Sequence, residues 1–314
     1  MYYLGVDVGG TNIATGVVDK NGKIVKKVSL KTEGGRTPQE ITKTVYETIE
    51  KAISNSGLTK NDFKYIGVGI PGCVDNKKGK IILTENMNFT GFDFVSELNK
   101  YIDLPVVMAN DANCAALGEL IAGGAKGYSN AVMITIGTGI GGGFVLDKKV
   151  YEGANGAAFE AGHMIIEKDG KECNCGRKGC FEQYASATAL VSLTKEYLEK
   201  YPSSKMHKYL NDKNEPTGYT SFKAAKENDE AGLMVVDIFA GYLAEGISDI
   251  INLIQPEILL VGGGISHEGD FLLDRVRNYT KDKVYAYGKI PSTIIKKAEL
   301  GNDAGIIGAA FLNV

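Results

Sequence analysis

One histidine and three cysteines near the middle of the chain have the types and spacing of a metal site. His163, Cys173, Cys175 and Cys180 form the pattern H-x9-C-x-C-x4-C. Three thiolates and one imidazole complete a tetrahedral zinc shell, and a shell without an open position is typical of a structural ion. The spacing therefore predicts structural Zn²⁺ that orders the loop 163–182. The cysteines carry this prediction more firmly than His163, which alone could be an ordinary polar residue.

Two acids flank the predicted zinc loop, Glu160 before it and Glu182 after it. Folding the loop around a metal would bring both acids near one place. Carboxylates of fixed orientation are good acceptors for the hydroxyl groups of a sugar. The alternative for each is a solvated surface acid.

A further acid follows a predicted buried strand at 106–108. Asp111, preceded by Asn110, stands where that strand gives way to a helix of small residues. Ligands of α/β proteins bind at the carboxyl ends of strands. Asp111 could therefore take a proton from a substrate hydroxyl during phosphoryl transfer, with Asn110 supplying hydrogen bonds from the same turn. The alternative is that Asp111 only caps the helix, a common role of aspartate.

A glycine-rich segment occurs twice in the chain. Residues 4–19 and 132–147 align on Gly9 and Gly137, and each contains an apolar strand, a glycine turn, a second apolar strand and a closing aspartate. Glycine turns let backbone N–H groups converge on an anion. An acid beside a phosphate, here Asp7, has an electrostatic purpose if Mg²⁺ lies between them. The repeat predicts two lobes that hold a phosphate between them, although a plain hairpin would explain either turn alone.

Two further glycine patterns limit the class of nucleotide site. Gly137-x-Gly139-x-x-Gly142 matches the dinucleotide fingerprint, but an apolar strand follows it where that fingerprint needs a helix. No G-x-x-x-x-G-K-[ST] sequence occurs, which excludes a P-loop enzyme. A third cluster, Gly262–Gly264, ends a predicted strand and could lie close to a nucleoside.

The elements that must position these residues follow one plan, repeated. We predict strands followed by helices in each half, and the first half begins with a strand meander that continues into 24–30. Helices are predicted at 38–56, which a capping box at Thr37 and Glu40 begins, at 111–122, at 187–201, which Ser186 caps, and at 229–255 and 304–312. A strand is predicted at 258–261 and a loop at 203–218. The repetition indicates a duplicated α/β fold with a cleft between its halves. We expect a small lobe at 1–120, on which a helix at 303–314 packs back, and a large lobe at 121–302.

Composition excludes several classes of protein. The chain has 314 residues, 44% hydrophobic and 23% charged, with a net charge of −3. This charge disfavours a nucleic-acid surface, and no apolar stretch approaches the ~20 residues that span a bilayer. The strand-like start leaves no room for a signal peptide. We therefore expect a cytoplasmic protein that binds neither nucleic acid nor membrane.

Together these motifs resemble the ROK family (repressor, open reading frame, kinase), and the resemblance spans essentially the whole chain. It is closest to the bacterial members that phosphorylate glucose. The residues that carry it are Asp7-x-Gly-Gly-Thr11, Asn110-Asp111-Ala-Asn, Gly137-Thr-Gly-x-Gly141, Glu160-Ala-Gly-His163 and Cys173-x-Cys175-Gly-x-x-Gly-Cys180. The resemblance implies an actin-like, hexokinase-like ATPase fold of the ribonuclease H type, with two lobes that close on sugar and ATP. It also implies a homodimer or homotetramer.

The resemblance further implies ATP-dependent transfer of the γ-phosphoryl group to the C6 hydroxyl of glucose, with Asp111 as catalytic base. His163 would use one ring nitrogen for zinc and the other for sugar. The implied sugar contacts are Asn110, Asp111, Glu160, His163 and Glu182. The implied contacts to the phosphates and Mg²⁺ are Asp7, Gly9, Gly10, Thr11, Gly137, Thr138 and Gly139, with Gly263 at the adenosine.

One departure from the family pattern concerns the sugar. Many relatives have glycine before the glutamate of Glu-x-Gly-His, whereas here Phe159 precedes Glu160. Alternatives to glucose are N-acetylglucosamine, N-acetylmannosamine, mannose, fructose and allose, because contacts to the C2 substituent decide between them. A sugar-binding transcriptional regulator is a further alternative, disfavoured by the acidic charge and by a first glycine motif that starts near residue 7.

Overall fold

The computed structural model describes residues 1–33, 35–84 and 87–314. The described chain divides into two compact units. Unit 1 comprises Met1–Met133, Gly143–Phe159 and Ala298–Val314, and unit 2 comprises Ile134–Gly142 and Glu160–Lys297. The boundary that we placed at residue 120 lies inside unit 1, and the C-terminal segment also belongs to that unit.

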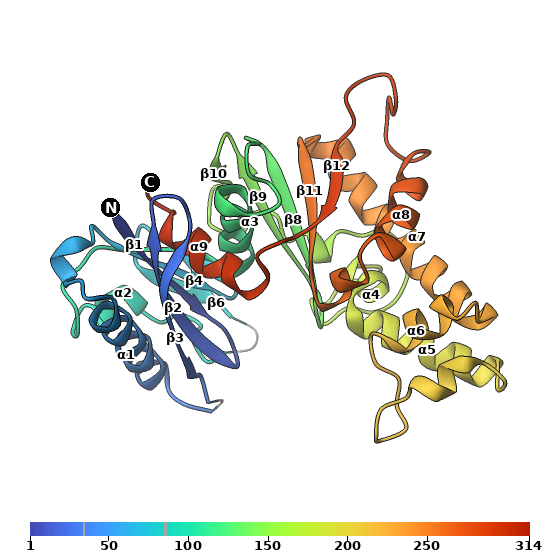
Figure 1. The fold of residues 1–314 in the computed structure, drawn as a ribbon, viewed down its shortest axis with the longest axis horizontal. Helices are drawn as coiled ribbons and strands as arrows, with labels where there is room; N and C mark the ends of the chain where they lie inside the picture. Colours follow the sequence, from blue (N-terminus) through green and yellow to red (C-terminus); the bar gives the residue numbers. More distant parts are fainter. Residues whose placement is uncertain (34, 85–86) are drawn as a thin grey trace. The chain divides into compact units, whose positions relative to one another are not determined.

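The first sheet is built by two kinds of strand pairing. β1 (Tyr2–Val8), β2 (Asn12–Asp19) and β3 (Ile24–Lys31) form the predicted antiparallel meander. β4 (Ile66–Ile70) and β7 (Val106–Asn110) then add in parallel, which gives the order β3-β2-β1-β4-β7 (Figure 1). A separate hairpin consists of β5 (Cys73–Asp75) and β6 (Lys80–Leu83).

One face of this sheet carries α1 (Pro38–Ser56) and α2 (Phe94–Leu98). α1 begins at the predicted capping box, in which Thr37 and Glu40 exchange hydrogen bonds, and ends at Gly57 in the left-handed conformation. Strand side chains alternate between the two faces. The apolar set on this face packs with the buried stripe of α1, and the cluster includes Leu4, Val6, Val8, Ile41, Val45 and Ile49.

The other face of the first sheet receives α9 (Ala304–Ala310), which follows the short 3₁₀ helix Gly301–Asp303 and lies beside α3 (Asp111–Ala122) (Figure 1). Glycines permit this contact between backbones. A Cβ added to Gly5 would lie 2.0 Å from the carbonyl oxygen of Ile306, and one added to Gly67 would lie 1.7 Å from that of Ala309. Every residue of α9 is buried, so the C-terminal helix is part of the core of unit 1.

The second sheet repeats the strand order of the first. β8 (Ala131–Ile136), β9 (Ile140–Leu146), β10 (Lys149–Val150), β11 (Ile258–Gly263) and β12 (Ile294–Lys297) have the order β10-β9-β8-β11-β12. If the strands of each sheet are numbered one to five along the chain, both sheets have the spatial order third, second, first, fourth, fifth. This equivalence supports the predicted duplication. The two glycine turns occupy matching positions, between β1 and β2 and between β8 and β9.

Two of the remaining helices were predicted from the sequence. α5 (Ala187–Lys200) is capped by Ser186 as expected, and α7 (Glu230–Ile254) is capped by Asp229, at which the sequence prediction began the helix. The loop predicted at 203–218 instead contains the 3₁₀ helix Lys205–Tyr209, because Met206 is fully buried there. The other helices are Lys60–Asp62, Ala161–His163, α4 (Glu182–Ala185), α6 (Thr220–Lys226), Gly264–Glu268 and α8 (Asp270–Thr280). Among the described helices, none has the length and apolar character to cross a membrane.

Candidate functional site

The predicted zinc ligands form one cluster in unit 2. One possible ligand atom from each of His163, Cys173, Cys175 and Cys180 lies within 4.8 Å of the others. The Cys173 Sγ is 3.8 Å from His163 Nδ1, and the Cys175 and Cys180 sulfurs are 3.6 Å apart. Ligands on a tetrahedral zinc with Zn–S bonds near 2.3 Å are separated by about 3.8 Å. The donor set and its spacing therefore fit a structural zinc ion.

Glycines let the zinc loop fold back on itself. The amide of Gly176, at a φ of 85°, donates to the carbonyl of Cys173. Gly179 has a φ of 80°, and a Cβ there would lie 1.7 Å from the carbonyl oxygen of Glu167. No other residue could occupy position 179 without moving the backbone. The loop geometry thus places Cys175 and Cys180 on the same side as His163.

Glu182 connects the cysteine cluster to the second glycine turn. Its Oε1 accepts from the Cys173 thiol at 3.2 Å and lies 3.7 Å from His163 Nδ1. Its Oε2 lies 2.4 Å from the position that a Cβ on Gly139 would occupy. Glu160 directly precedes the 3₁₀ helix that carries His163, and its carbonyl accepts from the His163 amide. Unit 2 therefore brings Glu182, which we predicted to bind the sugar, next to the glycine turn that we predicted to bind phosphate.

The second glycine turn is held by the helices that follow the zinc loop. The Ala187 amide donates to the carbonyl of Gly137 at 2.9 Å, and the Thr188 hydroxyl donates to that of Thr138 at 2.8 Å. Gly137 and Thr138 themselves are exposed. Gly142 lies within β9, so a strand follows this turn and the dinucleotide alternative is excluded. The turn offers an open backbone to an anion.

Gly263 lies beside the strand that leads into the second glycine turn. It has a φ of 83°, and a Cβ there would lie 2.2 Å from the carbonyl oxygen of Ile136. Gly263 is exposed at the end of β11. A ligand that reached the Gly137 turn could thus extend along bare backbone at Gly263.

In unit 1 the first glycine turn has a similar construction. The Gly9 amide donates to the carbonyl of Asn12, and Thr32 donates its hydroxyl to the carbonyl of Gly9 and its amide to that of Thr11. Gly10 and Thr11 are exposed at the tip. Hydrogen bonds therefore also hold the backbone of this turn, while the residues at its tip are exposed.

Asp7 and Asp111 stand at the carboxyl edge of the first sheet. Asp7 on β1 pairs with Gly69 on β4, and Gly69 pairs on its other side with Ala109 of β7. A Cβ at Gly69 would lie 3.7 Å from the Cα of Asp111. Burial, and then the charge of Asp111, raises the pKa of Asp7 to about 6. Burial also raises the pKa of Asp111. The Ala112 amide donates to the Asp111 carboxylate and by itself lowers that pKa, but the effect of burial is larger.

Asn110, and not Asp111, caps α3. The Asn110 Oδ1 accepts from the amides of Ala112 and Asn113 at 2.9 and 3.2 Å, and its Nδ2 donates to the carbonyl of Gly72. Asp111 is the first residue of the helix. The capping alternative for Asp111 is thereby wrong. The amide of Asn110 is largely engaged in holding this turn.

The structure adds two observations on neighbours of the site residues, Gly305 and Phe159. A Cβ on Gly305 in α9 would lie 3.0 Å from Cγ of Asp7, although the two residues are far apart in sequence. Phe159, noted for its departure from the family pattern, has a φ of 66°, a conformation that favours glycine. Its ring lies 5.8 Å from that of Phe144. Phe159 therefore holds a backbone conformation that glycine would adopt without strain.

The predicted site residues fall into two groups. Unit 1 holds Asp7, Gly9, Gly10, Thr11, Asn110 and Asp111. Unit 2 holds Gly137, Thr138, Gly139, Glu160, His163, Cys173, Cys175, Cys180, Glu182 and Gly263. Each group presents a glycine turn together with at least one acid.

Comparisons with known proteins cover the whole chain. The family model described as "ROK family" matches residues 3–314. A glucokinase of Halalkalibacterium halodurans is 36% identical over 313 residues, which cover 99% of this chain and 94% of that protein. A xylose repressor of Bacillus spizizenii is 30% identical over 322 residues, which cover 100% of this chain and 78% of the repressor.

A solved structure agrees with these relatives. The crystal structure of a ROK family glucokinase from Streptomyces griseus, in complex with glucose and AMPPNP, has a TM-score of 0.82 and 32% identity to this chain and covers 99% of both chains. The predicted fold class is therefore confirmed. The chain has the two-lobe actin-like ATPase fold.

Proposed function

The chain belongs to the ROK family, and from that premise we propose that it is a glucokinase, which transfers the γ-phosphoryl group of ATP to the C6 hydroxyl of glucose. The observation that carries the chemistry is the placement of Asp111. It stands at the carboxyl edge of the first sheet, beside the half-buried Asp7, and the capping role is taken by Asn110. Asp111 is therefore not needed as the cap of α3, although its carboxylate accepts the Ala112 amide.

In the proposed reaction Asp111 accepts the proton of the C6 hydroxyl as that oxygen forms its bond to the γ-phosphorus. The bond between the γ-phosphorus and the bridging oxygen breaks, and ADP leaves. A base with a raised pKa is better matched to neutral pH than an ordinary aspartate. Correct orientation of the two reactants supplies much of the rate in such transfers.

The glycine turns are proposed to bind the phosphates. Gly10, Thr11 and Thr138 are exposed at the two turns, and their N–H groups are suited to phosphate oxygens. The Gly137 amide instead donates to the carbonyl of Gly139, so Gly137 would serve the phosphate by leaving room for it. Asp7 would hold Mg²⁺ through water, where the ion would neutralise charge on the transferred group. Gly263 would lie along the adenosine.

We assign the sugar hydroxyls to Asn110, Asp111, Glu160, His163 and Glu182. Support comes from the position of Glu182, whose Oε2 lies against Gly139 and whose Oε1 lies 3.2 Å from the Cys173 sulfur. The Nδ1 of His163 faces that cluster, so its Nε2 would serve the sugar. Structural Zn²⁺ would hold His163 and the loop in place.

Glucose is proposed over other hexoses and amino sugars because the kinase relatives reported above are named glucokinases. The test is a coupled ADP-release assay with ATP, Mg²⁺ and a panel of glucose, mannose, fructose, allose, N-acetylglucosamine and N-acetylmannosamine. We expect the highest kcat/KM for glucose. A higher kcat/KM for another sugar would overturn the choice of glucose. Absence of turnover with every sugar would overturn the proposal that the chain is a sugar kinase.

A sugar-binding regulator is the second candidate function, because a xylose repressor aligns with the whole chain. Retention on double-stranded DNA at low salt separates the candidates. We expect that DNA does not retain the protein.

We also propose that the chain forms a homodimer or a homotetramer. Light scattering would distinguish the two by their mass.

A further inference from the structure

We propose that Glu119 is a positioning residue, whose buried carboxylate fastens the segment at Glu299–Leu300 to the end of α3 and so holds the elements around Asp7 and Asp111. Glu119 is completely buried on α3. It belongs to none of the metal, phosphate or sugar contacts assigned above. The inference rests on the proposed function for its catalytic consequence only.

The carboxylate of Glu119 accepts three backbone hydrogen bonds. Oε1 receives the amides of Glu299 and Leu300 at 2.8 and 2.7 Å, and Oε2 receives the amide of Gly124 at 2.7 Å. Bonds to an ionised acceptor are shorter and stronger than neutral ones. The three amides thus satisfy a buried charge, and the charge joins two segments that are far apart in the sequence.

The end of α3 is shaped to admit this carboxylate. The backbone carbonyl of Glu119 accepts from Gly123 and Ala125, so the chain turns around the residue. A Cβ on Gly123 would lie 2.1 Å from Glu119 Oε2. Glycine is therefore required at position 123 for the close approach, and the adjacent Gly124 supplies one of the donors.

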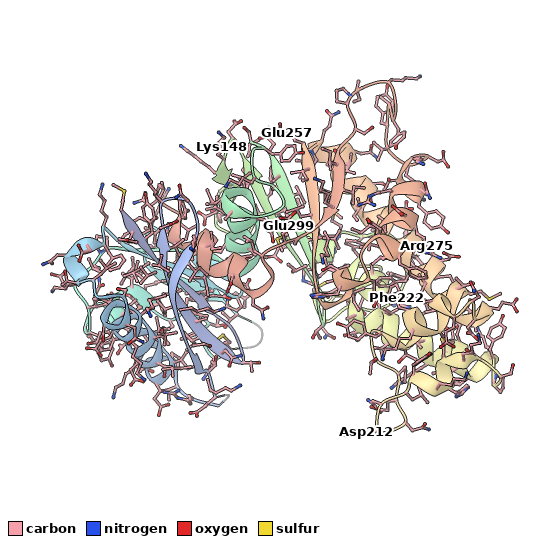
Figure 2. All side chains as sticks on the ribbon, viewed as in Figure 1. Lys148, Asp212, Phe222, Glu257, Arg275 and Glu299 are labelled. Atoms are coloured by element: carbon pink, nitrogen blue, oxygen red, sulfur yellow. The ribbon has the colours of Figure 1, made fainter. Side chains whose placement is uncertain are left out.

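The segment that Glu119 holds, Glu299–Leu300, follows directly after the chain passes from unit 2 back into unit 1. Unit 2 ends at Lys297, and unit 1 resumes at Ala298. Glu299, labelled in Figure 2, and Leu300 are thus among the first residues after the crossing. The clamp fixes the returning chain where it re-enters unit 1.

Each end of the clamp leads to a carboxylate of the proposed site, Asp111 or Asp7. α3, on which Glu119 lies, begins with Asp111. The segment after Leu300 leads into α9, where Gly305 lies against the carboxylate of Asp7. A Cβ on Gly118 would lie 2.1 Å from the carbonyl oxygen of Ala304, so α3 and α9 also touch beside the clamp. Loosening Glu119 would therefore shift the elements that set the separation of Asp7 and Asp111.

Glu119→Gln tests this role with little change of shape. An amide offers one acceptor oxygen, and its NH₂ group would face a backbone donor at one end of the clamp. The control is Asp229→Asn, because the Asp229 carboxylate also accepts three hydrogen bonds, from Ser204, Lys205 and Gly232, but lies in unit 2. Both variants are made in the full chain.

Two readouts are compared. Hydrogen exchange without ligands measures the amides of Gly124, Glu299 and Leu300, and those of the first turns of α3 and α9. Steady-state kinetics measures kcat and KM with glucose and Mg-ATP. We expect faster exchange at all these amides in Glu119→Gln, and a fall in kcat of about tenfold to a hundredfold with a glucose KM near that of the wild type, because misplacement by about 1 Å costs about a hundredfold.

Unchanged exchange at Glu299 and Leu300 would refute the clamp. Faster exchange there with an unchanged kcat, or an equal kcat loss in Asp229→Asn, would refute the positioning role. Absence of turnover in the wild type would instead refute the proposed function. In that case exchange in the first turns of α3 and α9 still decides whether Glu119 positions them.

Discussion

Gly139 and Glu182 approach so closely that a Cβ on Gly139 would lie 2.4 Å from Oε2 of Glu182. The same carboxylate contacts the Cys173 thiol through its other oxygen. Glu182 is thus confined between the second glycine turn and the cysteine cluster. A carboxylate that binds sugar hydroxyls from this position would be oriented by both the glycine turn and the cysteine cluster.

Gly139→Ala should therefore weaken sugar binding. The added methyl group would displace the Glu182 carboxylate, and loss of a hydrogen bond to a charged group should raise the glucose KM at least about tenfold. Gly241→Ala is the control, because a Cβ at that position in α7 meets nothing within 4 Å. Steady-state kinetics would check both variants, and an unchanged KM in Gly139→Ala would remove Glu182 from the sugar contacts.

Asp111→Asn should abolish turnover and largely preserve sugar binding. Asparagine has similar shape but cannot accept the hydroxyl proton at neutral pH, and loss of a general base typically costs about 10²- to 10⁴-fold in kcat. Calorimetric titration with glucose would measure binding separately from turnover. Asp103→Asn, which changes an exposed acid of the same unit, should retain full activity. Near wild-type kcat in Asp111→Asn would exclude Asp111 as the base.

The sequence allowed prediction of elements whose signals are local. Both hairpins of the repeat, the capping box at Thr37 and the cap Ser186 depend on residues within a few positions of one another. The cysteine spacing predicted the cluster at 163–180 for the same reason. Short-range patterns of this kind report a structure without knowledge of the rest of the fold.

Contacts between distant segments could not be predicted in this way. Nothing in the sequence pairs Gly305 with Asp7, or Glu119 with Glu299, because tertiary packing alone brings them together. Near the site, Asn110 and Asp111 are both good capping residues, and only the folded turn shows that Asn110 takes the cap. Local motifs were therefore easier to predict than the distant residues that hold them in place.

Cys175→Ser should release zinc and destabilise the loop at 163–182. The metal stabilises only the folded ligand set, so its loss lowers the free energy of unfolding, and Tm should fall by at least about 5 °C. Elemental analysis of the purified protein should find one zinc per wild-type chain and none in the variant. Cys114→Ala, which changes a buried thiol of unit 1, should keep its zinc. Active wild-type protein without zinc would contradict the assignment.

Asp7→Asn should make the protein more stable at neutral pH and inactive. Because burial and the charge of Asp111 raise the pKa of Asp7 to about 6, the folded chain binds more protons than the unfolded chain between pH 3.8 and about 6. The free energy of unfolding therefore falls as pH rises through this window, by at most about 3 kcal/mol. Asparagine does not titrate and escapes this loss.

Urea unfolding at pH 7 and pH 4 would measure this difference. The midpoint of Asp7→Asn should exceed that of the wild type at pH 7, and the gap should narrow by pH 4. Asp19→Asn should behave in the opposite way, because the Lys23 and Asn21 amides lower the pKa of Asp19 and so stabilise the folded chain above that pKa. A lower midpoint for Asp7→Asn at pH 7 would mean that the Asp7 carboxylate stabilises the protein without metal. A role beside Mg²⁺ would then no longer be needed to explain why a half-buried acid occupies the first glycine motif.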